Sequence, residues 1–317
     1  MKLIVQIPCH NEEHTLPETL ADIPREIIGV DKVEILIIDD GSTDRTLEVA
    51  KELGVEYIVR NKKNIGLART FRRGVEACLK ADADIIVNTD GDNQYAGQDI
   101  PKLIRPILNG TADIVVGNRQ TGTLPHFSKS KKFIQWFGSG IVRKLSGVWV
   151  PDAVSGFRAI SREAAIRLNI VSSYSYTVEM LIQAGKRDMK VESIPIRTNP
   201  QKRESRLFKS IPKFIERQFT TIVRMYSMYQ PLKVFFYIGL VLSALGAMPI
   251  IRFLYFYFTD NGDGHLQSLL LGVALVLMGF ITFLIGLVAD LISFNRQLLE
   301  MTLERVKQLE IKNSNHE

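Results

Sequence analysis

Cysteine is scarce in this chain, which has only Cys9 and Cys78 among its 317 residues. The two lie far apart and lack the spacing of metal ligands, so a disulfide framework and a zinc site are both excluded as expectations. Because free cysteine is usually buried, we expect two reduced core residues. A signal peptide is also absent, since the apolar stretch at residues 3–7 is short and runs directly into polar residues. We therefore expect the soluble part to stay in the cytosol.

Two common nucleotide-binding motifs are missing as well. No G-x-G-x-x-G follows a predicted strand and there is no Walker A lysine loop, which disfavours a dinucleotide fold and a P-loop enzyme. The net charge of +6 and the pI of about 9.2 fit either nucleic acid or an anionic membrane surface as a partner. Two long apolar runs in the C-terminal third favour the membrane, and we expect no nucleic-acid partner.

Short β-branched runs alternate with amphipathic helical patterns over the first two thirds of the chain. Strands are predicted at residues 3–7, 33–38, 55–59, 85–87, 114–116 and 190–196, and helices at 15–28, 43–53, 66–81, 133–145, 162–168 and 177–184. This alternation predicts an α/β fold with a parallel sheet buried on both faces. Such sheets bind ligands at the carboxyl ends of their strands, where the polar clusters of this sequence fall.

Residues 234–258 and 266–289 each provide the roughly 20 apolar residues that a transmembrane helix needs. Lysine and arginine flank the pair but are absent from the connecting residues 259–265, so the positive-inside rule places both termini and the catalytic domain in the cytoplasm of a cell-membrane protein. We divide the chain into a catalytic domain (1–210), an amphipathic interface helix (211–230), a two-helix membrane region (231–292) and a cytoplasmic tail (293–317). For the interface helix, an ordinary surface helix is the alternative. The charged tail makes a homo-oligomer plausible.

Asp90 and Asp92 directly follow the fourth strand and are one residue apart. Two carboxylates in this arrangement can share Mg²⁺ or Mn²⁺, which prefer oxygen ligands, and Gln94 offers another oxygen. The ion would offset charge on a departing nucleoside diphosphate. An acidic surface turn is the structural alternative for this triplet taken alone.

A second acidic pair, Asp39 and Asp40, follows the second strand. Asp44 alone could cap the next helix, so two further carboxylates exceed what capping requires and can accept hydrogen bonds from a ribose or a base. The first strand ends in a third polar cluster that faces the same crevice. This cluster contains Pro8, Asn11 and Glu12.

Together these motifs resemble family-two inverting glycosyltransferases, in the branch of dolichol-phosphate-mannose synthase and polyprenyl-phosphate glycosyltransferases. The resemblance rests on the order of Ile7-Pro8, Asn11-Glu12, Asp39 to Asp44, Asn64-Ile65-Gly66, Asp90-Gly91-Asp92, Gln94 and Ser155-Gly156-Phe157-Arg158. It implies a GT-A fold followed by two membrane spans. The implied reaction is metal-dependent transfer of one hexose from a GDP- or UDP-sugar to dolichyl or undecaprenyl phosphate.

The resemblance also implies roles for individual residues. Pro8, Asn11, Glu12, Asp39, Asp40 and Asp90 would contact the nucleotide, and Asp90, Asp92 and Gln94 would hold the metal and the diphosphate. Arg119 matches a basic residue near the phosphates, and Asp152 matches an acidic residue near the transfer site. We therefore assign Asp92, Arg119 and Asp152 to catalysis.

The acceptor phosphate needs alignment more than it needs a base. A phosphate monoester has a second pKa of about 6 and is mostly ionised at pH 7, so the enzyme must orient it and offset its charge. Candidate residues for this task are Ser155, Arg158, Lys131, Lys132, Arg143, Arg203, Ser205 and Arg206. Lys131 and Lys132 fit lipid headgroups equally well. For Arg158 the alternative is a structural ion pair at the edge of the core.

Two other functions fit parts of the sequence. A processive polysaccharide synthase would carry Gln-x-x-Arg-Trp before several spans, but the nearest stretch, residues 218–224, has the wrong spacing and no tryptophan. A non-catalytic membrane scaffold would typically have lost a metal carboxylate, and both are present here. One departure bears on substrates: relatives often carry Gly-x-Ser-Lys before the first span, where this chain has Arg-Glu-Ser-Arg at 203–206.

Overall fold

The computed structural model describes residues 1–120, 129–171, 176–200, 220, 223–224, 226–259 and 266–314, with backbone only for 129–137 and 314. The chain forms two compact units. The first contains Met1–Ile222 and Glu304–Glu317, and the second contains Val223–Leu303.

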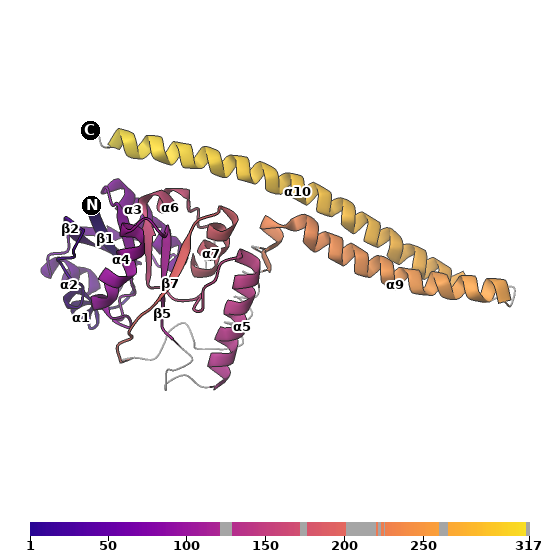
Figure 1. Ribbon diagram of the computed structural model, residues 1–317, viewed down its shortest axis with the longest axis horizontal. Helices are drawn as coiled ribbons and strands as arrows, with labels where there is room; N and C mark the ends of the chain where they lie inside the picture. The colour runs from indigo at the N-terminus through magenta and orange to yellow at the C-terminus, as the bar shows by residue number, and fades with distance from the viewer. Residues whose placement is uncertain are drawn as a thin grey trace. The chain divides into compact units, whose positions relative to one another are not determined.

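A seven-stranded sheet in the order β3-β2-β1-β4-β6-β5-β7 forms the centre of the first unit (Figure 1). Its strands are β1 (Lys2–Cys9), β2 (Lys32–Asp39), β3 (Tyr57–Arg60), β4 (Ile85–Asn88), β5 (Ile114–Asn118), β6 (Arg158–Ser161) and β7 (Val191–Pro195). All run parallel except β6, which is antiparallel to both of its neighbours. The expectation of a wholly parallel sheet was therefore wrong, because apolar periodicity reports burial of a strand and not its direction.

Helices cover both faces of this sheet. One face packs against α1 (Leu16–Ala21), α2 (Thr46–Glu52) and α4 (Ile100–Leu108), and the other against α3 (Leu67–Lys80), α6 (Arg162–Arg167) and α7 (Tyr176–Lys186). Alternate residues of β1 serve the two sides, and Leu3, Val5 and Ile7 join the core beneath α1 and α4. The remaining helices are the short η1 (Gly97–Asp99) and α5 (Lys129–Ser146), which contacts α7.

Two helices differ from the sequence-based prediction. The first ends at Ala21, well before residue 28, because Pro24 follows closely and a proline disfavours helical backbone in the residue before it. Helix α4 was missed. It carries Pro101 in its first turn, where proline is favoured, and Pro106 in its interior, where proline usually breaks a helix.

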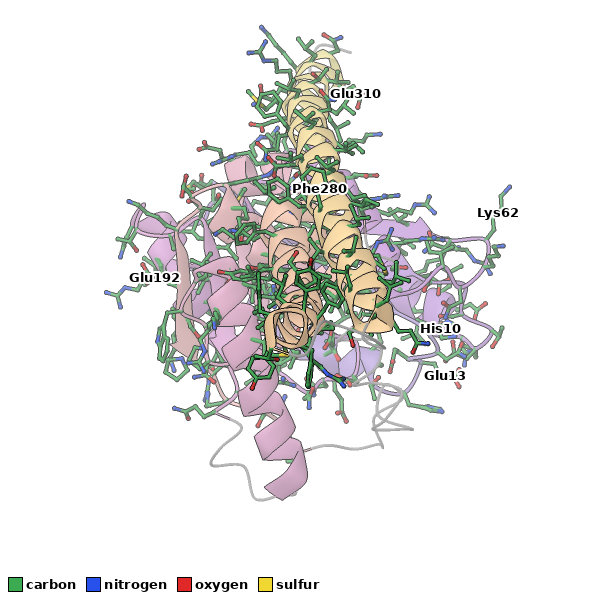
Figure 2. The ribbon with its side chains drawn as sticks, turned by 90° about the vertical axis from the view of Figure 1, so that its right-hand side faces the viewer. His10, Glu13, Lys62, Glu192, Phe280 and Glu310 are labelled. Carbon is green, nitrogen blue, oxygen red and sulfur yellow. The ribbon has the colours of Figure 1, made fainter. Side chains whose placement is uncertain are left out.

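The second unit contains α9 (Pro231–Thr259) and the part of α10 (Leu266–Ser314) up to Leu303. Both helices are long and apolar enough to cross a membrane. Only 11% and 17% of their most apolar windows are buried, and Phe280, labelled on α10 in Figure 2, is 57% exposed. Burial this low is unlike a core helix of a soluble protein. The predicted tail at 293–317 continues α10 without a break as far as Ser314. Most of the predicted interface helix at 211–230 lies outside the described residues.

Glycines bring the two hairpin helices close together. A Cβ atom on Gly239 would lie 2.7 Å from the carbonyl oxygen of Gly279, and one on Gly246 would lie equally close to that of Gly272. Small residues permit this approach of backbones, which is how helices gain packing energy in lipid.

Candidate active site

The loops after β1 and β2 hold each other at the carboxyl edge of the sheet. The first of them carries His10 and Glu13, which lie close together in Figure 2. The backbone N–H of Asn11 donates to the Ser42 hydroxyl (2.9 Å), and the Asn11 side-chain oxygen accepts from the backbone N–H of Thr43 (2.8 Å). Asn11 has a φ of 56°, which asparagine tolerates better than most residues. Its side chain thus supports the second loop, and a nucleotide contact from Asn11 stays a prediction.

Asp40 is engaged by the protein itself. Its Oδ1 accepts from the Asn61 side chain (2.8 Å) and from the Ile65 N–H (2.9 Å), and its Oδ2 accepts from the Gly66 N–H (3.1 Å). With 5% of its surface exposed, this carboxylate organises the loop between β3 and α3. The role of Asp40 in nucleoside binding stays a prediction. A nucleoside contact would come in addition to these three hydrogen bonds within the chain.

Asp39 is fully buried and also has partners in the chain. Its Oδ1 accepts from the Ser42 N–H (2.9 Å), and its Oδ2 lies 3.4 Å from the Nε of the exposed Arg60. Gly41 allows the loop after β2 to pass close to the loop after β3. Its φ is +69°, and a Cβ atom there would come within 2.7 Å of the Lys63 backbone.

The carboxylates at the end of β4 have fewer partners. Asp92 accepts a hydrogen bond from the Gln94 N–H (3.2 Å), and protein surrounds the Asp90 carboxylate although the residue keeps some exposed surface. Burial, followed by repulsion from Asp92, raises the Asp90 pKa to about 7. A divalent cation would relieve that unfavourable charge, so this oxygen donor set fits Mg²⁺ or Mn²⁺.

Substrate oxygens would be needed to complete the coordination shell. Among the residues that the structure describes, no group of three or more His, Cys, Asp or Glu side chains could hold a metal ion. Two carboxylates alone leave several positions open, and a diphosphate supplies oxygens of the right kind. The site therefore fits a metal that arrives with a nucleotide.

The turn between the two carboxylates is anchored to α1. The Gly91 carbonyl accepts hydrogen bonds from the hydroxyls of Thr15 (2.8 Å) and Thr19 (3.2 Å). A Cβ atom on Gly91 would lie 3.0 Å from the Sγ of Cys9 and 3.3 Å from the Cγ of Glu12. Glycine thus suits this position because the end of β1 packs directly beneath it.

Arg119 and Asp152 form a bidentate ion pair next to these carboxylates. The Arg119 Nε and Nη2 donate to the two Asp152 oxygens at 2.7 and 3.0 Å. Burial alone would lower the pKa of Arg119, but Tyr95 and Asp152 raise it, so the guanidinium stays charged. Its side chain is 10% exposed and that of Asp152 is 1% exposed. Within this pair, the Arg119 guanidinium holds a fixed positive charge near Asp90.

Two residues expected to bind the acceptor lie in the core. The guanidinium of Arg158 is fully buried and donates to the carbonyl oxygens of Ser155 (2.9 Å), Thr177 (2.8 Å) and Ala153 (2.8 Å). Burial lowers the pKa of Arg158 to about 10. This position favours a structural role for Arg158, whose partners are backbone carbonyls in place of the expected ion pair. Contact with an acceptor phosphate is not supported by it. Ser155 is also fully buried, and its hydroxyl lacks a hydrogen-bond partner among the described residues.

The other acceptor candidates are spread over the chain. Arg143 stacks on the exposed Trp149, with 4.5 Å from its Cζ to the ring centre, and donates to the Ser139 carbonyl. Lys131 and Lys132 lie on the backbone of α5, but their side chains fall outside the described residues, as do Arg203, Ser205 and Arg206 altogether.

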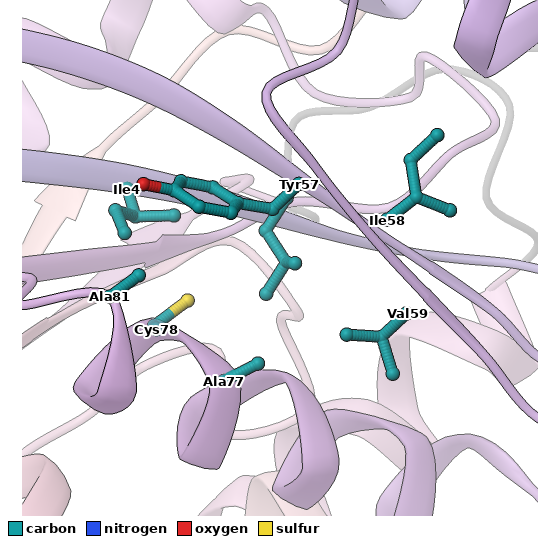
Figure 3. A pocket seen from close by; sticks show the side chains of 8 residues that line it. Ile4, Tyr57, Ile58, Val59, Ala77, Cys78 and Ala81 are labelled. Carbon is teal, nitrogen blue, oxygen red and sulfur yellow. The ribbon is translucent and has the colours of Figure 1, made fainter. Parts of the chain in front are cut away.

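An apolar pocket of about 110 Å³ lies between α3 and strands β1 to β3 (Figure 3). Cys78 points its sulfur into it, next to Tyr57 and Ile4. Both cysteines of the chain are free and buried, as predicted. With this apolar lining the pocket suits no phosphate or sugar, and the carboxylates at the strand ends remain the candidate site.

Comparison with known proteins assigns the chain to a family. Residues 4–168, more than half of the chain, match the model "Glycosyl transferase family 2", and residues 230–294 match the "GtrB C-terminal hairpin". The chain belongs to glycosyltransferase family 2. It is thus an enzyme, with a GT-A-like core and a hairpin of two apolar helices.

Named relatives of this glycosyltransferase act on lipid phosphates. It is 28% identical over 207 residues to an undecaprenyl-phosphate mannosyltransferase of Micrococcus luteus, covering 62% of this chain and 83% of the relative. It is 34% identical over 203 residues to a dolichol-phosphate mannosyltransferase of Pyrococcus furiosus, covering 61% of this chain and 55% of that protein.

Solved structures agree on the fold. Glucosyl-3-phosphoglycerate synthase of Mycobacterium tuberculosis, in complex with Mn²⁺, UDP and phosphoglyceric acid, superposes with a TM-score of 0.57 at 20% identity, covering 71% of this chain and 78% of that one. The same synthase is known with Mg²⁺ and UDP. At this identity the likeness establishes the fold of the glycosyltransferase alone.

Several residues of the glycosyltransferase site were not anticipated. Thr15 and Thr19 anchor the turn between Asp90 and Asp92, and Tyr95 accepts a hydrogen bond from the Gly156 N–H (2.9 Å). Asn88 and Tyr176 hold the Gly156 carbonyl from below. A polar residue ending an otherwise apolar strand was the available signal for Asn88, whereas nothing local marked Tyr176.

Proposed function

We propose that this glycosyltransferase moves one hexose from a nucleotide-sugar to a polyprenyl phosphate, with inversion at the sugar carbon, at the cytoplasmic face of a membrane. The observation that carries the proposal is the presence, in one chain, of a family-two catalytic domain and a hairpin of two exposed apolar helices. The named lipid-phosphate relatives support the same acceptor class. In the proposed topology both termini are cytoplasmic, and the catalytic domain extends to about residue 210.

The metal site supports a nucleotide-sugar donor. Asp90 and Asp92, with Gln94, would hold Mg²⁺ or Mn²⁺ together with the donor diphosphate, and a bound cation would neutralise charge on the leaving nucleoside diphosphate. Glu12 is 7% exposed and lies against the same turn, which favours a role for it in shaping the nucleotide site.

The chemistry needs a charge pattern more than a proton acceptor. An ionised phosphate oxygen of the lipid would form the new bond to the sugar carbon while the bond from that carbon to the diphosphate oxygen breaks. Arg119 would align the phosphates and offset their repulsion. Asp152 accepts three hydrogen bonds from Arg119, two from the guanidinium and one from the backbone N–H, and would position it. Because the acceptor phosphate is already ionised, no general base is required.

A transfer assay tests the proposal. Full-length protein in detergent would receive radiolabelled UDP- and GDP-sugars one at a time, with Mn²⁺ or Mg²⁺ and a polyprenyl phosphate. We expect label to enter the organic phase with one donor and transfer to stop when EDTA removes the metal. Nucleotide binding without any lipid product would reject the polyprenyl phosphate as acceptor.

A further inference from the structure

Beneath the metal carboxylates, the peptide of Gly156 is held from both sides. Its N–H donates to the hydroxyl of Tyr95 (2.9 Å), and its carbonyl accepts from the side-chain amide of Asn88 (2.9 Å). The same amide lies 2.9 Å from the hydroxyl of Tyr176. The N–H and the carbonyl belong to the two peptide units on either side of Gly156, so these hydrogen bonds hold the backbone of Gly156 in place on both sides of its Cα atom.

Asp90 rests directly on this peptide. A Cβ atom built on Gly156 would lie 3.0 and 3.1 Å from the two Asp90 carboxylate oxygens, which is tighter than most real contacts of a Cβ atom. A displacement of the Gly156 backbone would therefore move the surface on which this carboxylate packs.

The supporting side chains are buried polar groups. Asn88 and Tyr176 are fully buried, and the Asn88 oxygen accepts from the Gln6 amide at 3.0 Å. The Tyr176 ring stacks on Phe71, with 3.9 Å between ring centres and 5° between planes. A phenylalanine at 176 would keep this stack without a hydroxyl. Burying a hydroxyl costs free energy unless it is hydrogen-bonded, so the contact of the Tyr176 hydroxyl with Asn88 accounts for a tyrosine at this position.

We propose that Tyr176 and Asn88 are positioning residues for the metal carboxylate Asp90 and act through the peptide of Gly156. The inference rests on the proposed function, because it assigns Asp90 to the metal. A positioning role differs from a purely structural role in its effect on metal binding. A variant that lacks the Tyr176 hydroxyl should bind metal more weakly than a core variant that loses the same amount of stability elsewhere.

Mn²⁺ binding to full-length protein in detergent tests this, measured by electron paramagnetic resonance of free Mn²⁺ with UDP and separately with GDP. Tyr176→Phe removes the hydroxyl and keeps the stack, and should weaken Mn²⁺ binding about three- to tenfold, the effect of one hydrogen bond. Phe71→Leu is the matched control. It disrupts the same ring pair and lowers the melting temperature, but should leave Mn²⁺ affinity as in the wild type.

Gly156→Ala is a second probe, because its new methyl group would press on the Asp90 oxygens and on the Tyr176 hydroxyl. We expect it to weaken Mn²⁺ binding more than Tyr176→Phe does. Wild-type affinity in Tyr176→Phe, or equal weakening in Phe71→Leu, would overturn the inference and leave the proposed function intact. A wild-type protein that binds no Mn²⁺ with either nucleotide would instead reject the metal assignment, and the inference with it.

Discussion

The two acidic strand ends look alike in sequence but differ in what the protein does with them. At the end of β2, Asp40 receives three hydrogen bonds from its own chain. At the end of β4, Asp92 receives one and Asp90 has a raised pKa. Saturated carboxylates stabilise loops, whereas under-satisfied and mutually repelling ones attract a cation. The number of internal donors therefore distinguishes the two strand ends and favours the end of β4 as the proposed cation site.

The largest expected effect is at the second pair. Asp92→Asn removes a metal charge but keeps the volume and the hydrogen-bond acceptor, so it should lower lipid-linked sugar formation at least about 10²-fold without unfolding the protein. The transfer assay with a melting curve measures both properties. Full activity in this variant would remove Asp92 from the metal site.

The first pair should respond in the opposite way. Asp40→Ala removes the acceptor of three hydrogen bonds. The Asn61 amide and the Gly66 N–H each keep a second acceptor, so only the Ile65 N–H loses its partner outright. We expect a loss of about 2 kcal/mol in the free energy of unfolding. Chemical denaturation of the variant in detergent measures this. Asp92→Asn is the matched control, with less than about 1 kcal/mol expected for its single backbone partner. Equal losses in the two variants would erase the distinction between the strand ends.

The pH dependence sharpens the comparison further. Asp90 must lose its proton to bind a cation, so Mn²⁺ affinity should rise with pH up to about 7, by at most about tenfold per unit. Titrations between about pH 5.5 and 8 with UDP test this, with protein-free Mn²⁺–UDP measured at each pH as the control. An affinity that does not change over this range would contradict the raised Asp90 pKa.

The same shift predicts the stability of the metal-free protein. A carboxyl whose folded pKa is raised contributes stability below its unfolded pKa of about 3.9, and this contribution is lost as pH rises through the folded value of about 7. Asp90→Asn should remove the part of the pH-dependent loss of stability that comes from Asp90. Melting curves of both proteins in EDTA would show it as a smaller decline for the variant.

The smallest effect should come from Arg60. Its 3.4 Å contact with Asp39 is at a side chain 60% exposed to solvent, so Arg60→Ala should change the free energy of unfolding by less than about 1 kcal/mol. Chemical denaturation at low and high salt measures the change. A loss as large as that of Asp40→Ala would mean that Asp39 depends on this arginine more than on its backbone partner.

Prediction from sequence succeeded where the signal was local. Every strand of the α/β core except β6, the two apolar helices and the buried cysteines followed from short-range patterns. It failed where partners come from distant segments. Nothing near Arg158 in sequence revealed that three backbone carbonyls would surround its guanidinium, and the direction of β6 depends on where its preceding loop enters the sheet.

By itself, the sequence determined the family, the acidic motifs at the strand ends and the two apolar helices, because composition, spacing and hydrophobic runs are properties of consecutive residues. Only the tertiary structure decided which carboxylates the protein already uses, that Arg119 is paired with Asp152, and that Asp90 lies on the peptide of Gly156. These are contacts between residues tens of positions apart, and a side chain's hydrogen bonds and burial depend on all the segments that surround it.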